Sequence, residues 1–180
     1  MWSLVLSSWA PRFLSGAPAR RIEVRPGDLI LISGANGSGK TSLMNDLFDA
    51  AQRLRLTVCS VPQLSERQFP LSITLNEILE IYSAASTSVL LEGLDLSRSW
   101  TTASGGERAR VLLASALQQD VHLLLMDEPD QSLDQKSKAC LQKSLSDWLS
   151  ADVHRACVVV SHQSWADARI KCIRLDQDHV

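Results

Sequence analysis

The sequence lacks the features that mark several classes of protein. No apolar run approaches the roughly 18 consecutive residues that a membrane-spanning helix needs, so we expect no transmembrane segment in these 180 residues. The four cysteines, Cys59, Cys140, Cys157 and Cys172, form no C-x-x-C pair, which predicts isolated buried thiols and no metal or disulfide framework. Lys and Arg number 18 against 20 Asp and Glu, so no overall basic charge indicates nucleic acid as a partner.

The composition favours one globular domain. Hydrophobic residues make up 45% of the chain, which is enough apolar material for a sizeable core. The opening segment MWSLVLSSWA is apolar, but no positively charged segment precedes its apolar run as in a secretory signal. We therefore expect an N-terminal edge strand there.

Short aliphatic runs alternate with longer amphipathic segments, which is typical of an α/β fold with a predominantly parallel sheet. We expect strands at residues 28–33, 56–61, 122–127, 156–161 and 171–176. The expected helices cover residues 40–54, 104–119 and 135–151, the second of them capped by Ser104. Residues 64–103 lie between these elements and are expected to form a small, mainly helical lobe.

The segment GANGSGKTS, residues 34–42, follows a predicted strand and opens a predicted helix. It satisfies the pattern G-x-x-x-x-G-K-[ST], in which glycines let backbone N–H groups converge on a phosphate at a helix N-terminus. We expect Lys40 to reach the β and γ phosphates of a nucleotide and Thr41 to ligate Mg²⁺. The expected nucleotide-binding residues of this loop are Gly34, Ala35, Asn36, Gly37, Ser38, Gly39, Lys40, Thr41 and Ser42.

A second acidic motif, HLLLMDEP at residues 122–129, ends a predicted strand. Its carboxylates, Asp127 and Glu128, then lie at the carboxyl edge of the sheet, where ligands of α/β folds bind. Asp127 suits Mg²⁺ coordination, and Glu128 suits the orientation and deprotonation of an attacking water. A strand that simply ends in two solvated acids would be an ordinary alternative.

Six segments, taken together and in this order, resemble the motifs of an ABC-type ATPase. They are GANGSGKT (34–41), VPQ (61–63), ASGGERARVLLASAL (103–117), LLLMDEP (123–129), SLD (132–134) and VVVSH (158–162). The resemblance extends over about residues 22–176 and implies a single P-loop NTPase domain, residues 1–180, that hydrolyses ATP with Mg²⁺.

The resemblance also implies roles for residues outside the phosphate loop. Gln63 matches the glutamine that contacts Mg²⁺ and the attacking water, and His162 matches the histidine that touches the γ phosphate. Asp134 matches an aspartate that communicates across a dimer. The turn that contacts the γ phosphate held by a second subunit matches Ser104, Gly105 and Gly106.

A site divided in this way implies a head-to-tail dimer, in which the second ATPase subunit can be an identical copy. We expect the chain to be the ATPase subunit of a membrane transporter, bound to integral-membrane permease subunits at the cytoplasmic face. The apolar residues of 66–79, which are Phe69, Leu71, Ile73 and Leu75, are either a docking surface for that partner or core. The alternatives are a soluble ABC ATPase acting on nucleic acid or ribosomes, and a small P-loop kinase.

Three features of the sequence depart from the resemblance or leave it open. Asp130 stands where a small residue is commoner, and Ser115 stands where arginine is common. Adenine normally stacks on an aromatic residue upstream of the phosphate loop, for which Trp9 and Phe13 are candidates, although packing explains them equally well.

Overall fold

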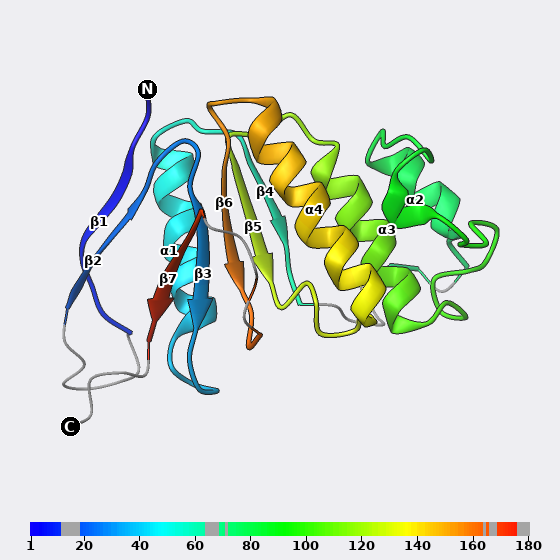
Figure 1. The fold of residues 1–180 in the computed structure, drawn as a ribbon, viewed down its shortest axis with the longest axis horizontal. Coiled ribbons are helices and arrows are strands. Elements are labelled where there is room, and N and C mark those ends of the chain that lie inside the picture. The colour runs from blue at the N-terminus through cyan, green and yellow to red at the C-terminus, as the bar shows by residue number, and fades with distance from the viewer. Residues whose placement is uncertain (12–18, 64–68, 71, 164, 166–168, 176–180) are drawn as a thin grey trace.

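A computed structural model describes residues 1–11, 19–63, 69–70, 72–163, 165 and 169–175. Its centre is a sheet of five parallel strands (Figure 1). In spatial order these are β4 (Val58–Val61), β5 (Leu123–Asp127), β6 (Ala156–Val160), β3 (Leu29–Ser33) and β7 (Ile170–Arg174). The predicted α/β fold with a predominantly parallel sheet is confirmed.

The remaining elements cover the two faces of this sheet. Helix α1 (Lys40–Arg53) lies on one face together with an antiparallel pair, β1 (Leu4–Trp9) and β2 (Arg20–Val24). Helices α3 (Gly105–Leu117) and α4 (Gln135–Ala151) cover the other face. At the end of the molecule remote from β1, the short α2 (Leu75–Ile81) and the 3-10 helix η1 (Val89–Leu91) pack on α3 (Figure 1).

Side chains of the central strands alternate between two separate cores, as the two-residue period of a strand requires. In β3, Leu29 and Leu31 belong to the core under α3 and α4, whereas Ile30 and Ile32 belong to the core under α1. The same alternation holds along β5 and β6. A sheet buried on both faces accounts for the continuous apolar runs of its strands.

The N-terminal strand forms where it was expected, but it does not join the central sheet. β1 pairs with β2, and this second strand was not predicted. The thiol prediction is correct for Cys157, which is fully buried, and wrong for Cys172, which is exposed on the edge strand β7. Cys59 and Cys140 are partly buried, and all four thiols are free.

The apolar side chains of Phe69, Ile73 and Leu75 pack inward. The ring of Phe69 lies 4.9 Å from that of the fully buried Trp100, centroid to centroid, at an edge-on angle of 70°. Leu75 is fully buried, and Phe69 and Ile73 pack against the same core. These contacts favour the core interpretation of the segment; Leu71 lies outside the described residues.

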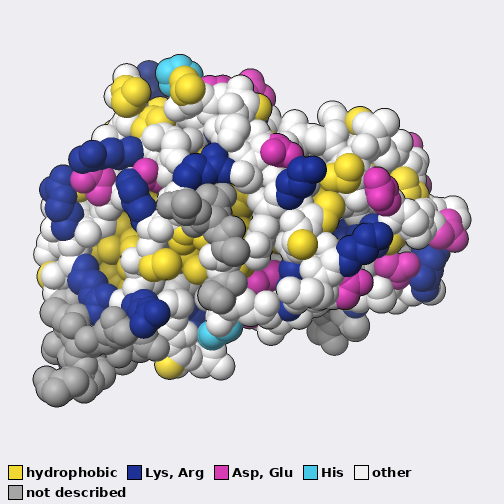
Figure 2. All heavy atoms as spheres, viewed as in Figure 1, with side chains coloured by type: hydrophobic (Ala, Val, Ile, Leu, Met, Phe, Trp, Pro, Cys, Tyr) yellow, Lys and Arg dark blue, Asp and Glu magenta, His cyan; other side chains and the backbone are white. Residues whose placement is uncertain are grey.

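Basic side chains gather over the end of the molecule that carries β1, β2 and β7 (Figure 2). Several of them are paired with acidic neighbours: Arg21 and Arg25 with Glu23, and Lys171 with Asp28. The positive charge of this end is therefore partly neutralised. Among the described residues, no helix is both long enough and apolar enough to span a membrane.

Candidate functional site

A cleft of about 660 Å³ opens at the carboxyl edge of the central sheet, beside the first turn of α1. Segments far apart in the chain converge there, because parallel strands deliver their ends to one edge. Its lining residues come from the phosphate loop and from the segments that follow β4, β5 and β6. They are Asn36, Gly37, Gly39, Lys40, Thr41, Ser42, Gln63, Asp127, Glu128, Gln131 and His162.

The phosphate loop has a backbone that only glycine adopts without strain. Gly37 and Gly39 have φ values of 81° and 94°, in the left-handed region. Around Gly37 there is open space, whereas a Cβ on Gly39 would lie 2.8 Å from the Cβ of Pro11, just beyond β1. The end of β1 and the residue just beyond it therefore pack directly against this loop.

The Lys40 side chain lies along the inside of the loop. Its ammonium donates to the carbonyls of Gly34 and Ala35, both at 2.9 Å, and the residue is 8% exposed. The nearby Ser38 hydroxyl is buried and has no hydrogen-bond partner within the described part of the chain. A cradle with a fixed cation and a spare buried hydroxyl suits a phosphate group.

The carboxylates of Asp127 and Glu128 line the same cleft as Lys40 and the first turn of α1. The Thr41 hydroxyl lies 3.4 Å from Asp127, so the end of β5 meets the first turn of α1. Burial raises the pKa of Asp127, and the Glu128 charge raises it further, while Thr41 and Lys40 act in the opposite direction. A divalent cation with oxygen ligands fits here, because it would relieve this crowding of negative charge.

Glu128 is held by residues from two other segments. One of its carboxylate oxygens lies 3.0 Å from His162 Nε2, and the other accepts from the Gln63 amide at 3.1 Å. Gln63 also donates to Gln131 at 3.3 Å. The Glu128 backbone has a φ of 51°, a left-handed conformation that is strained for a side chain of this kind. The structure thus brings Gln63, Glu128 and His162 together.

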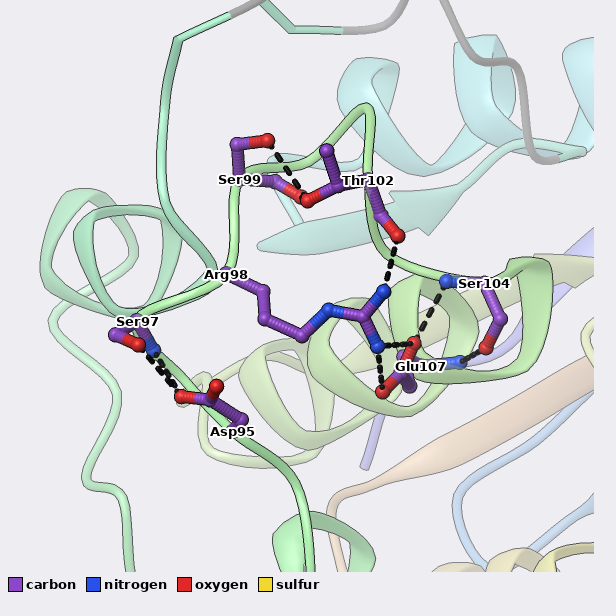
Figure 3. A network of polar contacts seen from close by, with 7 residues as sticks. All are labelled: Asp95, Ser97, Arg98, Ser99, Thr102, Ser104 and Glu107. Carbon is purple, nitrogen blue, oxygen red and sulfur yellow. Dashed lines mark hydrogen bonds and ion pairs between the residues drawn. The ribbon is translucent and has the colours of Figure 1, made fainter.

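The turn at Ser104 begins α3 and is held by a local polar network (Figure 3). Ser104 and Glu107 form a capping box, in which each side chain accepts from the other's backbone N–H at 3.2 and 2.7 Å. The Ser104 N–H lowers the pKa of Glu107, and Arg98 pairs with the same carboxylate at 2.9 Å. The predicted Ser104 cap is confirmed.

The two glycines of this turn allow close packing on the segment before α4. A Cβ on Gly106 would lie 2.9 Å from the Ser132 carbonyl oxygen, and one on Gly105 would lie 3.3 Å from the Ser132 hydroxyl. Asp134 caps α4 by accepting from the Ser137 N–H at 2.7 Å, which lowers its pKa. The described residues lining the cleft include neither this turn nor Asp134.

Trp9 is not placed to stack on a ligand in the cleft. It is 6% exposed, packs in the core under α1, and donates its Nε1–H to Asp46 at 2.9 Å. The packing interpretation therefore holds for Trp9, and Phe13 lies outside the described residues. Gln131, which lines the cleft, was missed; its only signal in the sequence is its place between Glu128 and Asp134.

The fold and the cleft together define a P-loop nucleotide-binding domain. No protein-family model matches the chain. The chain is 31% identical to the zinc import ATP-binding protein ZnuC of Jannaschia sp. (strain CCS1), over 79% of this chain and 64% of that protein. It is 33% identical to ZnuC of Ruegeria pomeroyi, over 78% and 60%. It is 28% identical to the lipoprotein-releasing system ATP-binding protein LolD of Chromohalobacter salexigens, over 93% and 85%.

Solved structures show the same fold. A Pyrococcus furiosus protein described as an ABC transporter ATP-binding protein superposes with a TM-score of 0.73 at 17% identity, covering 96% of each chain. A dimeric ATP-binding cassette in a post-hydrolysis state with ADP and Pi gives 0.65 at 16% identity, covering 90% of this chain and 88% of that one. The chain is thus similar in sequence and in fold to ATP-binding proteins of the ABC type, and it spans less than two thirds of the length of the ZnuC relatives.

Proposed function

We propose that the chain binds and hydrolyses ATP with Mg²⁺ as the ATPase subunit of an ABC transporter. The observation that carries this proposal is the meeting of five groups around one cleft: the phosphate loop, Asp127, Glu128, Gln63 and His162. Such a set combines phosphate binding with a carboxylate base and two polar groups that orient it.

The phosphate loop binds the triphosphate, and Lys40 supplies the positive charge. Thr41 and Asp127 would hold Mg²⁺, with Gln63 as a further ligand, and the bound ion would supply positive charge to the phosphates. The Thr41 hydroxyl and the Asp127 carboxylate are well placed to share one ion, since their oxygens already lie 3.4 Å apart. The loop residues from Gly34 to Ser42 complete the nucleotide site.

Glu128 acts as the general base for hydrolysis. It takes a proton from the water that attacks the γ phosphate, and its two hydrogen bonds hold the carboxylate in one orientation. Gln63 and His162, which make those bonds, can turn toward the water and the γ phosphate when nucleotide is bound. Lys40 supports the same step by stabilising the charge that develops on the phosphates.

A second copy completes each site in a head-to-tail dimer. The turn of Ser104, Gly105 and Gly106 lies at the N-terminus of α3, and a helix N-terminus suits an anion. Because this turn does not line the chain's own cleft, it is available to the γ phosphate held by the partner copy. Asp134 lies on the segment that packs behind the turn, which supports a role in communication between the two sites.

The relatives support the transporter assignment over the alternatives. ZnuC and LolD are named as ATP-binding proteins of a zinc importer and of a lipoprotein-releasing system. By analogy, this chain binds integral-membrane permease subunits at the cytoplasmic face of a membrane. Copurification from gently solubilised membranes tests this assignment. A membrane protein with several spans found with the chain supports it, whereas ribosomes or DNA would favour a soluble ABC ATPase that acts on nucleic acid or ribosomes.

ATP hydrolysis by the purified chain tests the chemistry. Lys40→Ala should lower ATP affinity by about 100-fold, because charge-assisted contacts to two phosphates are lost. Glu128→Gln should keep the affinity and lower the turnover rate by at least about 100-fold. Lys143→Ala on the exposed face of α4 and Asp120→Asn are matched controls that should change neither quantity. Unchanged affinity in a folded Lys40→Ala protein would refute the site.

A further inference from the structure

Asp130 is buried although it lies in the turn directly after Glu128 and Pro129. It is 5% exposed, and one carboxyl oxygen accepts two hydrogen bonds from the segment after β6. The Ser161 hydroxyl donates to it at 2.8 Å, and the Trp165 indole N–H donates to the same oxygen at 3.2 Å. Both donors are themselves buried. A buried carboxyl group without such partners would strongly destabilise the fold.

This network fixes the residue that precedes His162. Ser161 donates its backbone N–H to the carbonyl of Ile32 in β3 at 3.1 Å, and its hydroxyl accepts from the Gln163 N–H at 3.0 Å. With Asp130 as a third partner, Ser161 is held by two other segments, β3 and the turn after β5, and by its own turn. The His162 ring extends from this point to Glu128, at 3.0 Å.

The contacts close a ring that contains both proposed reacting groups. From Glu128 the chain runs to Asp130, the hydrogen bond crosses to Ser161, and the His162 ring returns to Glu128. A small residue at position 130 could not reach Ser161, and the buried serine and indole donors would lose their acceptor. Asp130 stands where a small residue is commoner, and the buried donors Ser161 and Trp165 give its carboxylate the hydrogen bonds that a buried charge needs.

We propose that Asp130 is a positioning residue, which holds the His162 segment in register with Glu128 through Ser161 and Trp165. This inference rests on the proposed hydrolysis of ATP at the same cleft. Its action is on turnover rather than on nucleotide binding, because none of the three residues lines the cleft among the described residues. Displacement of a reacting group by about 1 Å can reduce a rate by about 100-fold.

The test compares Asp130→Ala with Asp130→Asn. The amide oxygen of asparagine can accept the same two hydrogen bonds, so Asp130→Asn should keep at least half of the wild-type kcat. Asp130→Ala should lower kcat by at least about 10-fold while KM for ATP changes by less than about twofold. Both rates are measured well below each protein's melting temperature, so loss of fold does not enter.

A spectroscopic readout separates positioning from general destabilisation. The five tryptophans are labelled with 5-fluorotryptophan, and Trp165→Phe assigns the fluorine signal of position 165. Asp130→Ala should shift that signal, and Asp130→Asn should restore it.

A wild-type kcat in Asp130→Ala overturns the inference and leaves the proposed function standing. If the wild-type protein fails to hydrolyse ATP, the proposed function fails. In that case only the fluorine signal tests the hydrogen-bond network of Asp130. A signal that Asp130→Ala leaves unchanged would refute this network.

Discussion

The hydroxyl of Thr41 and a carboxyl oxygen of Asp127 lie 3.4 Å apart, although 86 residues separate them along the chain. This contact joins the helix that follows the phosphate loop to the strand that ends in two carboxylates. Both oxygens face the cleft, beside the Glu128 charge. We therefore expect Mg²⁺ to stabilise the proposed site, and the crowding of negative charge around Asp127 has a measurable signature in pH.

Asp127→Asn should raise the stability of the nucleotide-free protein near pH 7. Burial and the Glu128 charge raise the pKa of Asp127 above 3.8, so its contribution to stability is complete below that pH. The contribution is lost as the pH rises through the raised pKa. In urea unfolding between pH 3.5 and 7, the stability of the variant relative to wild type should therefore rise with pH, and Mg²⁺-dependent ATP binding by the variant should weaken by about 10-fold or more. The exposed Asp120→Asn serves as control, and identical pH profiles of Asp127→Asn and wild type would contradict the expectation.

Gly39→Ala should disturb the phosphate loop more than Gly37→Ala does. Both residues have positive φ, so alanine adds a backbone strain of about 1 kcal/mol at each position. Only at Gly39 does the new Cβ also meet Pro11, at 2.8 Å. We expect a lower melting temperature and weaker ATP binding for Gly39→Ala than for Gly37→Ala. Equal effects would show that the contact with Pro11 does not support the loop.

Glu128→Gln should accumulate as a dimer when Mg-ATP is present. The amide keeps the shape of the side chain but cannot take the proton of the water, so bound ATP persists between two copies. Ser104→Arg in the same background should prevent the dimer, because it removes the cap of α3 and adds bulk at the turn. Light scattering at micromolar protein, with and without Mg-ATP, measures both effects. A monomeric Glu128→Gln protein with ATP bound would count against a site shared between copies.

Phe69→Ala should destabilise the fold by about 1–3 kcal/mol. The ring packs edge-on against the buried Trp100, so its loss removes an aromatic contact and leaves a partial cavity. ATP hydrolysis by the isolated protein, measured at low temperature, should not change. Thermal melting distinguishes core packing from a docking surface. Val153 is 71% exposed, so Val153→Ala serves as a control that should stay within about 0.5 kcal/mol of wild type. An unchanged melting temperature for Phe69→Ala would support the docking surface instead.

Much of the fold was predictable because local chemistry determines it. The apolar runs of the five central strands allow little beyond a sheet buried on both faces, and the glycine pattern before Lys40 requires a strand–loop–helix unit. Strand β2 was missed because its sequence, RRIEV, carries only two apolar residues. Its place depends on pairing with β1, which no local pattern encodes.

The side-chain contacts of the site lie beyond what sequence patterns determine. Asp130 stood out in the sequence only as a departure, because the buried hydroxyl of Ser161 and the indole of Trp165 come from a segment some thirty residues later. Gln131 reaches Gln63 only through the convergence of strand ends. The exposure of Cys172 follows from the position of β7 at the sheet edge, which depends on strand order.

The central sheet also divides the protein energetically. The helix after the phosphate loop packs its Leu47 into one core, and the helix that begins at Ser104 packs its Leu112 into the other. Leu47 and Leu112 belong to separate cores, so Leu47→Ala and Leu112→Ala should have additive free energies of unfolding within about 0.5 kcal/mol. The proposed nucleotide cleft at the carboxyl edge of the sheet is lined both by the first turn of α1 and by Gln131, which lies just before α4. Ligand binding in this domain can therefore connect two halves that, in its absence, respond to perturbation almost independently.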